Sequence, residues 1–183
     1  MMFCAGASEL VMSQWASSFA ESALGVSKSM GDLAGPCLFA VMMGIARAFY
    51  GKCSHRVPLE PLMILGCLLC ITSYLLAAFV TVPALAFVGC ALCGLSVGIF
   101  WPGVLSRATV KLPQGGIAMF AMLAVAGDLG CLVGPSLAGA VADLFGGELR
   151  IAFCFAVLFP LVNLIALLLQ RTKKKGESHE SST

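Results

Sequence analysis

The residues of this chain that could do chemistry are few, and most of them lie inside apolar sequence. Asp128 is the clearest case, because it sits near the centre of the apolar run from Ile117 to Ala142. A carboxylate is costly in hydrocarbon unless it faces a water-filled cavity, finds a partner or is protonated. We therefore predict that Asp128 binds protons and contacts a solute. The alternative is a protonated Asp bonded to a neighbouring helix, with a purely structural role.

A second set of polar residues interrupts the apolar stretch from Cys4 to Leu24. Gln14 and Trp15 occupy its middle, and one polar face runs along it, formed by Gln14, Ser17, Ser18 and Glu21. An indole can stack on the apolar face of a solute ring while an amide reads the hydroxyl groups beside it. We predict that Gln14 and Trp15 bind a small polar solute, against the alternative of helix packing or anchoring at the membrane interface.

Two further candidates stand closer to the ends of their apolar runs. Glu9 is predicted either to pair with a base such as Arg47 or to act as a second proton-coupling group. Gly94, Gly98 and Trp101 are spaced by four and three residues, so they share one face of a helix. We therefore expect the Trp101 ring to overlie bare backbone and leave space for a ligand or another helix. The alternative for Trp101 is a place in the aromatic belt at the membrane interface.

The elements that position these residues are apolar helices. Hydrophobic residues make up 60% of the 183 residues and charged residues 11%, far from the roughly 45–50% and 25% of soluble domains. A helix crosses the hydrocarbon in ~20 residues, and six stretches approach that length: 4–24, 33–50, 61–80, 84–106, 117–142 and 151–169. The alternation of a strand is absent, so the sequence predicts an all-α, polytopic membrane domain of six transmembrane helices over residues 1–170.

The basic residues predict the orientation of these spans. With the N-terminus inside, nine of the eleven Lys and Arg residues fall in inside segments, and only Lys28 and Arg150 fall outside. Basic residues accumulate on the cytoplasmic side, so both termini are predicted to be cytoplasmic in a protein of the cell membrane. Residues 171–183 are predicted to be a disordered basic tail against the anionic inner leaflet. The net charge of +2 then reflects topology, and no nucleic-acid partner is expected.

Cofactor, metal and enzyme functions find no support in the sequence. The Cys67/Cys70 and Cys90/Cys93 pairs have CxxC spacing but lie in apolar helices, and the two histidines fall in a loop and the tail. No Cys/His metal site can be assembled from them, so small thiols at helix contacts are expected. A serine nucleophile such as Ser96 would need a base within reach, and no span contains a histidine.

Small residues and prolines predict how the helices meet. In the fifth span they form a smooth stripe of Gly127, Gly130, Gly134 and Ala138, and in the fourth Gly94 and Gly98 form a GxxxG. Backbones can approach closely at such stripes; static packing and sliding during gating are both open. Kinks are expected near Pro102, Pro135 and Pro160. The third and sixth spans are charge-free and read as lipid-facing, which suggests an inverted three-plus-three repeat.

Several motifs together resemble the C-terminal six-helix half of the major facilitator superfamily of secondary transporters. The segment GIARAFYGKCSHR is similar to the basic glycine motif between the second and third helices of each half, and AGDLGCLVGPSLAGAVAD and SVGIFWPG look like its eleventh and tenth helices. GASELVMSQW resembles the seventh helix of sugar permeases of the fucose type. The matching motif residues, whose implied role is gating, are Gly44, Arg47, Gly51, Lys52 and Arg56.

The resemblance implies half of a secondary active transporter, working by alternating access and proton-coupled, with a sugar as the favoured solute. Its partner would be the missing N-terminal six-helix half or a second copy of the chain. The start at Met1 and Met2, directly before a span, leads us to expect a product cut from a longer frame. A non-transporting membrane scaffold or assembly subunit is the competing hypothesis.

Overall fold

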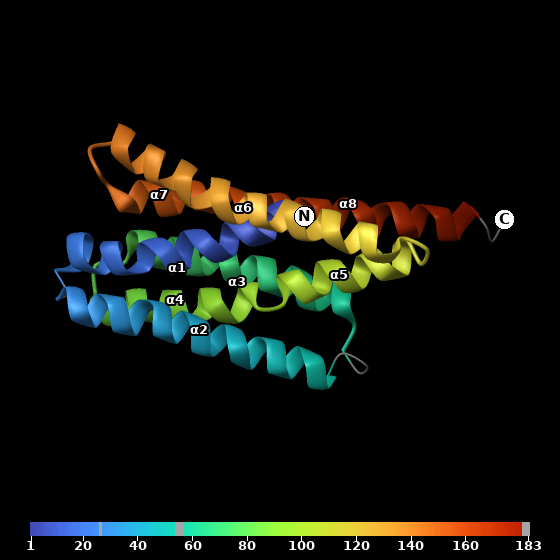
Figure 1. The fold of residues 1–183 in the computed structure, drawn as a ribbon, viewed down its shortest axis with the longest axis horizontal. Helices are drawn as coiled ribbons and strands as arrows, with labels where there is room; N and C mark the ends of the chain where they lie inside the picture. The colour runs from blue at the N-terminus through green and yellow to red at the C-terminus, as the bar shows by residue number, and fades with distance from the viewer. Residues whose placement is uncertain (26, 54–56, 181–183) are drawn as a thin grey trace.

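A computed structural model describes residues 1–25, 27–53 and 57–180, and the regular secondary structure in this part of the chain consists of helices (Figure 1). The predicted all-α class is confirmed. The helices are α1 (Met2–Leu24), α2 (Lys28–Cys53), α3 (Leu59–Phe79), α4 (Pro83–Val97), α5 (Phe100–Lys111), α6 (Gly116–Leu144), α7 (Leu149–Ala156) and α8 (Leu158–Glu180).

Prolines explain why the fourth and sixth predicted spans each consist of two helices. Pro102 lies in the first turn of α5 and Pro160 in the first turn of α8. Each lacks the amide that would bond the carbonyl four residues earlier, and these carbonyls belong to Gly98 and Ala156, where the preceding helices stop. The kinks expected there are confirmed as interruptions. Pro135 differs, because α6 runs through it without a break.

Five helical segments in the described chain are long and apolar enough to cross a membrane: α2, α3, α4 with α5, α6, and α7 with the first part of α8. The first predicted span, α1, falls short of that apolarity. It lies inside the bundle instead, in contact with α2, α4, α6, α7 and α8. Val11, Met12 and Phe19 of α1 are fully buried. A helix covered by its neighbours can carry polar residues that a lipid-facing helix could not.

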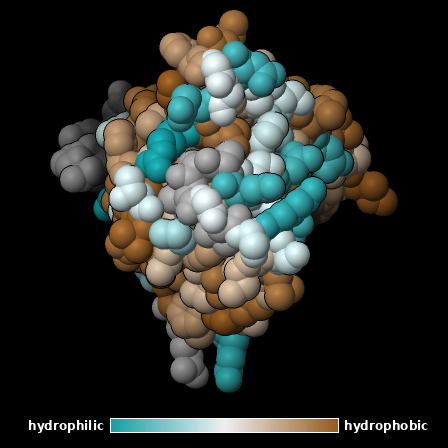
Figure 2. Space-filling view, turned by 90° about the vertical axis from the view of Figure 1, so that its left-hand side faces the viewer, coloured by the Kyte–Doolittle hydropathy of each residue, from teal (hydrophilic) through white to brown (hydrophobic). Residues whose placement is uncertain are grey.

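The predicted spans run roughly side by side, so their connections gather at two ends (Figure 1). In the structure these spans are α1, α2, α3, α4 with α5, α6, and α7 with α8. We call the end where α2 and α5 finish the basic end, because it carries Arg47, Lys52, Arg107, Lys111 and Arg171. The opposite end holds the α1–α2, α3–α4 and α6–α7 connections, with Lys28 and Arg150 among four carboxylates. Figure 2 looks onto this second end and shows hydrophilic residues gathered across it, with hydrophobic residues around them. The charge asymmetry predicted from the sequence therefore separates the two ends of the bundle.

Close backbone approach joins α1 to α6. A Cβ on Gly130 would collide with the backbone of Phe3, and one on Gly134 would come within 2.8 Å of Ala7. All four members of the predicted stripe, Gly127, Gly130, Gly134 and Ala138, are buried. A close backbone approach also joins α4 to α2, where a Cβ on Gly94 would collide with the Phe39 backbone. The predicted glycine contacts are confirmed, and they place the polar helix α1 directly against α6.

The third and sixth spans are exposed on one side only. Tyr74 of α3 is fully buried and donates a hydrogen bond to the Ser8 carbonyl of α1 at 2.8 Å. Its ring meets Phe153 of α7 edge-on, with 6.0 Å between ring centroids. On the other face of α3, Leu65 and Phe79 are exposed. One face of α3 therefore packs against α4, α7 and α8 and reaches α1 through Tyr74, while α7 and α8 pack against both α1 and α3. The absence of charge alone did not show these contacts.

The basic tail predicted for residues 171–183 begins within α8, whose backbone continues as helix to Glu180. Lys and Glu are good helix formers, and the segment contains no proline that would end the helix.

The α1–α6 contact can be tested with a matched pair of glycine substitutions. Gly130→Leu should lower the stability of the bundle, by about 1–3 kcal/mol for an overpacked contact, because the Phe3 backbone has no room to move aside. Gly44→Leu is the control, since Gly44 is also helical and nothing lies within 4 Å of a Cβ there. Thermal unfolding in detergent measures both, and equal midpoints for the two variants would contradict the packing described.

Candidate functional site

An exposed polar strip runs along α1 in the half that leads away from the basic end. Gln14, Ser18 and Glu21 recur at steps of four and three residues, so they share one face of the helix, and all three side chains are exposed. Ser17 borders the strip and hydrogen-bonds the Asp32 carboxylate of α2. Gln14 makes no hydrogen bond to the described residues. The predicted polar face therefore exists, and its amide is available to a solute.

Trp15 borders the strip on the α6 side. Its indole N–H donates to the Pro135 carbonyl at 3.1 Å, and its ring lies against Gly139, where a Cβ would come within 2.8 Å. The ring is only partly buried. The indole is therefore fixed by α6 through its N–H, which leaves its remaining exposed surface, and not the N–H, for contact with a solute.

Asp128 lies near the middle of α6 and is exposed. It precedes Pro135 and Gly139 by seven and eleven residues, so it shares their face of the helix, ~10 Å nearer the basic end than Pro135. Among the described residues its carboxylate has no hydrogen bond or ion pair. The alternative of an Asp bonded to a neighbouring helix thus finds no contact here. Asp128 and Trp15 belong to the same side of α6.

Glu9 and Arg47 form an ion pair between α1 and α2, with 3.5 Å between Glu9 Oε1 and Arg47 Nη2. The Glu9 side chain is 18% exposed and the Arg47 side chain 46%. The second carboxylate oxygen, Glu9 Oε2, is buried without a hydrogen-bond partner, although the Trp101 indole lies beside it. The pairing expected for Glu9 is therefore present, and half of its carboxylate remains unsatisfied.

Trp101 does not overlie Gly94 and Gly98, so that expectation is wrong. Those glycines face α2, and the break after α4 turns the following residues away from them. The Trp101 ring instead lies against Gly127 of α6, where a Cβ would come within 2.6 Å. Its Nε1 is buried without a hydrogen-bond partner. Trp101 thus belongs to the α5–α6 contact near Glu9, separate from Gln14 and Trp15.

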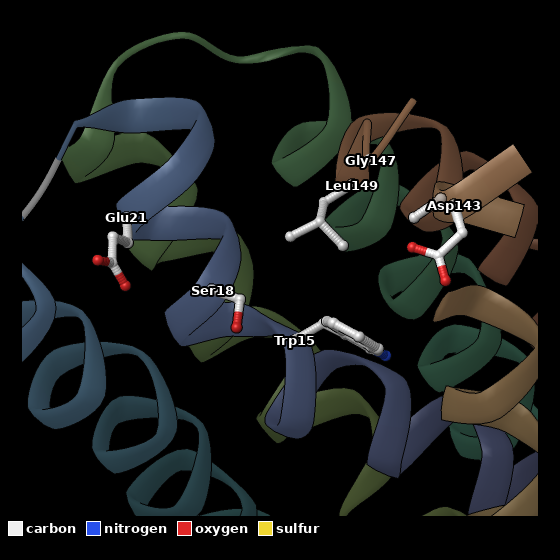
Figure 3. A pocket seen from close by; sticks show the side chains of 7 residues that line it. Trp15, Ser18, Glu21, Asp143, Gly147 and Leu149 are labelled. Carbon is white, nitrogen blue, oxygen red and sulfur yellow. The ribbon is translucent and has the colours of Figure 1, made fainter. Parts of the chain in front are cut away.

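A cavity of about 290 Å³ opens at the end of the strip that lies away from the basic end (Figure 3). Trp15, Ser18 and Glu21 of α1 line one side of it, and Asp143 of α6 and Leu149 of α7 line the other. Sequence reasoning missed Asp143, which follows the predicted end of the fifth span by one residue. The signal that could have found it is its spacing from Asp128 along a single helix.

The predicted gating motif lies mostly in helix and not in a loop. Gly44, Arg47, Gly51 and Lys52 all belong to α2, which extends to Cys53. Nothing lies within 4 Å of a Cβ at either glycine. Arg56 lies outside the described residues. Within the described part of the motif, Arg47 reaches another helix through the ion pair of its side chain with Glu9.

The fold and site define a class: a helical membrane protein whose least apolar span, α1, is central and keeps one polar face exposed. Comparison with protein families identifies that class further, because the family model of the Major Facilitator Superfamily matches residues 1–183. The chain belongs to the Major Facilitator Superfamily, a family of membrane transporters. A search of curated proteins found no match.

The Glu9–Arg47 pair can be measured with a double-mutant cycle. Glu9→Gln, Arg47→Gln and the double variant should show a coupling free energy of up to about 1 kcal/mol, because Arg47 is largely exposed and such pairs are weak. A control cycle combines Glu9→Gln with Lys52→Gln. Lys52 is five residues after Arg47 on the same helix and makes no ion pair with Glu9. Unfolding free energies give both values, and equal coupling in the two cycles would show that the pair does not form.

Proposed function

We propose that this chain is one six-helix half of a secondary active transporter that moves a small polar solute across the cell membrane by alternating access. The observation that carries the proposal is the open polar strip of Gln14, Ser18 and Glu21 on α1, the most enclosed helix of the bundle. A polar face that is exposed on an interior helix needs a watery path beside it. A second six-helix unit, either an N-terminal half or another copy, would enclose that path.

The solute would bind along the strip. Gln14 supplies an amide that can donate and accept hydrogen bonds, Ser18 a hydroxyl, and Trp15 an apolar surface held in place by Pro135. This combination suits a hydroxylated ring such as a sugar, because the ring carbons contact the indole while the amide reads the hydroxyls. The cavity between Glu21 and Asp143 would be its entrance from the end of the bundle opposite the basic end.

Proton coupling is assigned to Asp128, with Glu9 as a second candidate. Asp128 is exposed on the Trp15 side of α6 and has no cationic partner among the described residues, so protonation would not break an existing pair. Glu9 is paired with Arg47, and its protonation would release that pair. Both carboxylates lie on helices that border the strip, which is the arrangement in which a bound proton can change the solute site. With the basic end inside, both termini would be cytoplasmic.

Replacing Asp128 tests the coupling. In the assembled transporter, Asp128→Asn should abolish proton-driven accumulation, because an amide cannot carry the proton, while membrane insertion and solute exchange at equal concentrations persist. Ser136→Ala is the matched control, as an exposed polar residue two turns farther along α6, and it should keep accumulation. Uptake in vesicles under an imposed pH gradient gives the result. Unchanged accumulation in Asp128→Asn would assign the carboxylate a structural role.

The need for a second half is tested separately. The chain alone, purified and inserted into liposomes, should show no solute uptake above protein-free liposomes, because a single unit leaves the strip without an opposite wall. Addition of the complementary half should restore uptake. If the isolated chain transports as a monomer, verified by crosslinking, the half-transporter proposal fails. If a defined complex forms but no solute shifts its thermal unfolding, the scaffold hypothesis is favoured.

A further inference from the structure

A second polar cluster lies at the basic end, away from the strip, and joins three helices. Arg107 Nη1 lies 3.6 Å from Glu60 Oε2, and Arg171 Nε lies 3.6 Å from Glu60 Oε1. Arg107 Nη2 and Lys111 Nζ each donate to Gln170 Oε1 at 2.8 Å. We call Glu60, Arg107, Lys111, Gln170 and Arg171 the inner cluster. It brings α3, α5 and α8 together.

The inner cluster holds more positive charge than its own groups neutralise. Arg107 and Lys111 share one neutral amide oxygen, so their two nitrogens cannot be farther apart than twice 2.8 Å. Like charges at that separation repel each other. The cluster's only carboxylate, Glu60, is already divided between Arg107 and Arg171. An anion placed beside Lys111 and Arg171 would relieve this repulsion.

The surroundings of the cluster indicate the source of that anion. The apolar run of α8 ends immediately before Gln170, with Leu168 and Leu169 exposed. Val110 and Leu112, on either side of Lys111, are 80% and 59% exposed. Cations next to exposed aliphatic side chains match an anionic lipid, because its phosphate can contact the cations while its acyl chains cover the aliphatic surface. A soluble phosphate would gain nothing from the aliphatic surface.

We propose that the inner cluster binds the phosphate of an anionic membrane lipid, with Lys111 and Arg171 as its principal contacts. Arg107 is 15% exposed and Arg171 is 64% exposed, so Arg107 orients the cluster through Glu60 and Gln170 while Arg171 reaches the headgroup. Lys111, exposed at the last turn of α5, reaches it from the other side. This site is independent of the solute path and of proton coupling.

Thermal unfolding of the purified chain in detergent tests the proposal, with added phosphatidylglycerol, phosphatidylcholine or inorganic phosphate as probes. Phosphatidylglycerol should raise the unfolding temperature more than phosphatidylcholine does. The Lys111→Gln/Arg171→Gln variant should lose most of this difference. Binding should weaken roughly thirtyfold, because each cation near an anionic surface contributes about 1 kcal/mol. Lys28→Gln, which removes a cation at the opposite end, should keep it, and Lys111→Arg/Arg171→Lys should restore it.

Three results would overturn the proposal. The first is an equal response of the Lys111→Gln/Arg171→Gln variant and the original chain, with circular dichroism showing that both are folded. The second is an equal loss in Lys28→Gln, which would indicate attraction by net charge alone. The third is a full shift with inorganic phosphate, which would assign the cluster to a soluble anion instead of a lipid.

Discussion

Hydrocarbon offers no hydrogen bonds, and this constraint shapes the whole molecule. Every backbone amide at membrane depth must be satisfied within its own helix, so the chain forms helices wherever it crosses. The same constraint applies to side chains, since each polar group must face protein or water. The polar helix α1, which is less apolar than the other spans, is therefore the one enclosed by α2, α4, α6, α7 and α8. Other large aliphatic side chains of α3 and α8, such as Leu65, Leu68 and Leu169, lie on the outside.

Small residues make that enclosure possible. Helices in lipid gain little from hydrophobic burial against each other and depend on close packing. Glycines on α6 and α4 let α1 and α2 approach to backbone contact. The two interruptions before Pro102 and Pro160 begin among buried residues, since Gly98, Ile99 and Ala156 are buried. Packing and backbone chemistry thus act together to hold one polar face of α1 open beside α6.

Polar groups occupy two levels of the bundle, and the two levels differ in what their side chains contact. At mid-depth, Gln14, Trp15 and Asp128 border the side of α1 and α6 that remains open, where a solute and a proton would interact. At the basic end, Glu60, Arg107 and Gln170 tie α3, α5 and α8 together. The polar contacts at the basic end and the glycine contacts along the middle hold the six spans together as a single unit. In the proposed function, such a unit would move against a second one without changing its own packing.

The sequence by itself determined the fold class, the helix positions and the separation of charge between two ends, because hydropathy and helix length depend only on the order of residues. It also indicated the glycine contacts and the helix breaks at Pro102 and Pro160. Only the tertiary structure decided the neighbours of each polar residue. It placed Trp101 on Gly127 instead of Gly94 and Gly98, fixed the Trp15 indole on Pro135, and gathered Glu60, Arg107 and Gln170 from distant segments. Those contacts depend on how helices rotate and cross, and periodicity along one helix carries no information about the rotation of another.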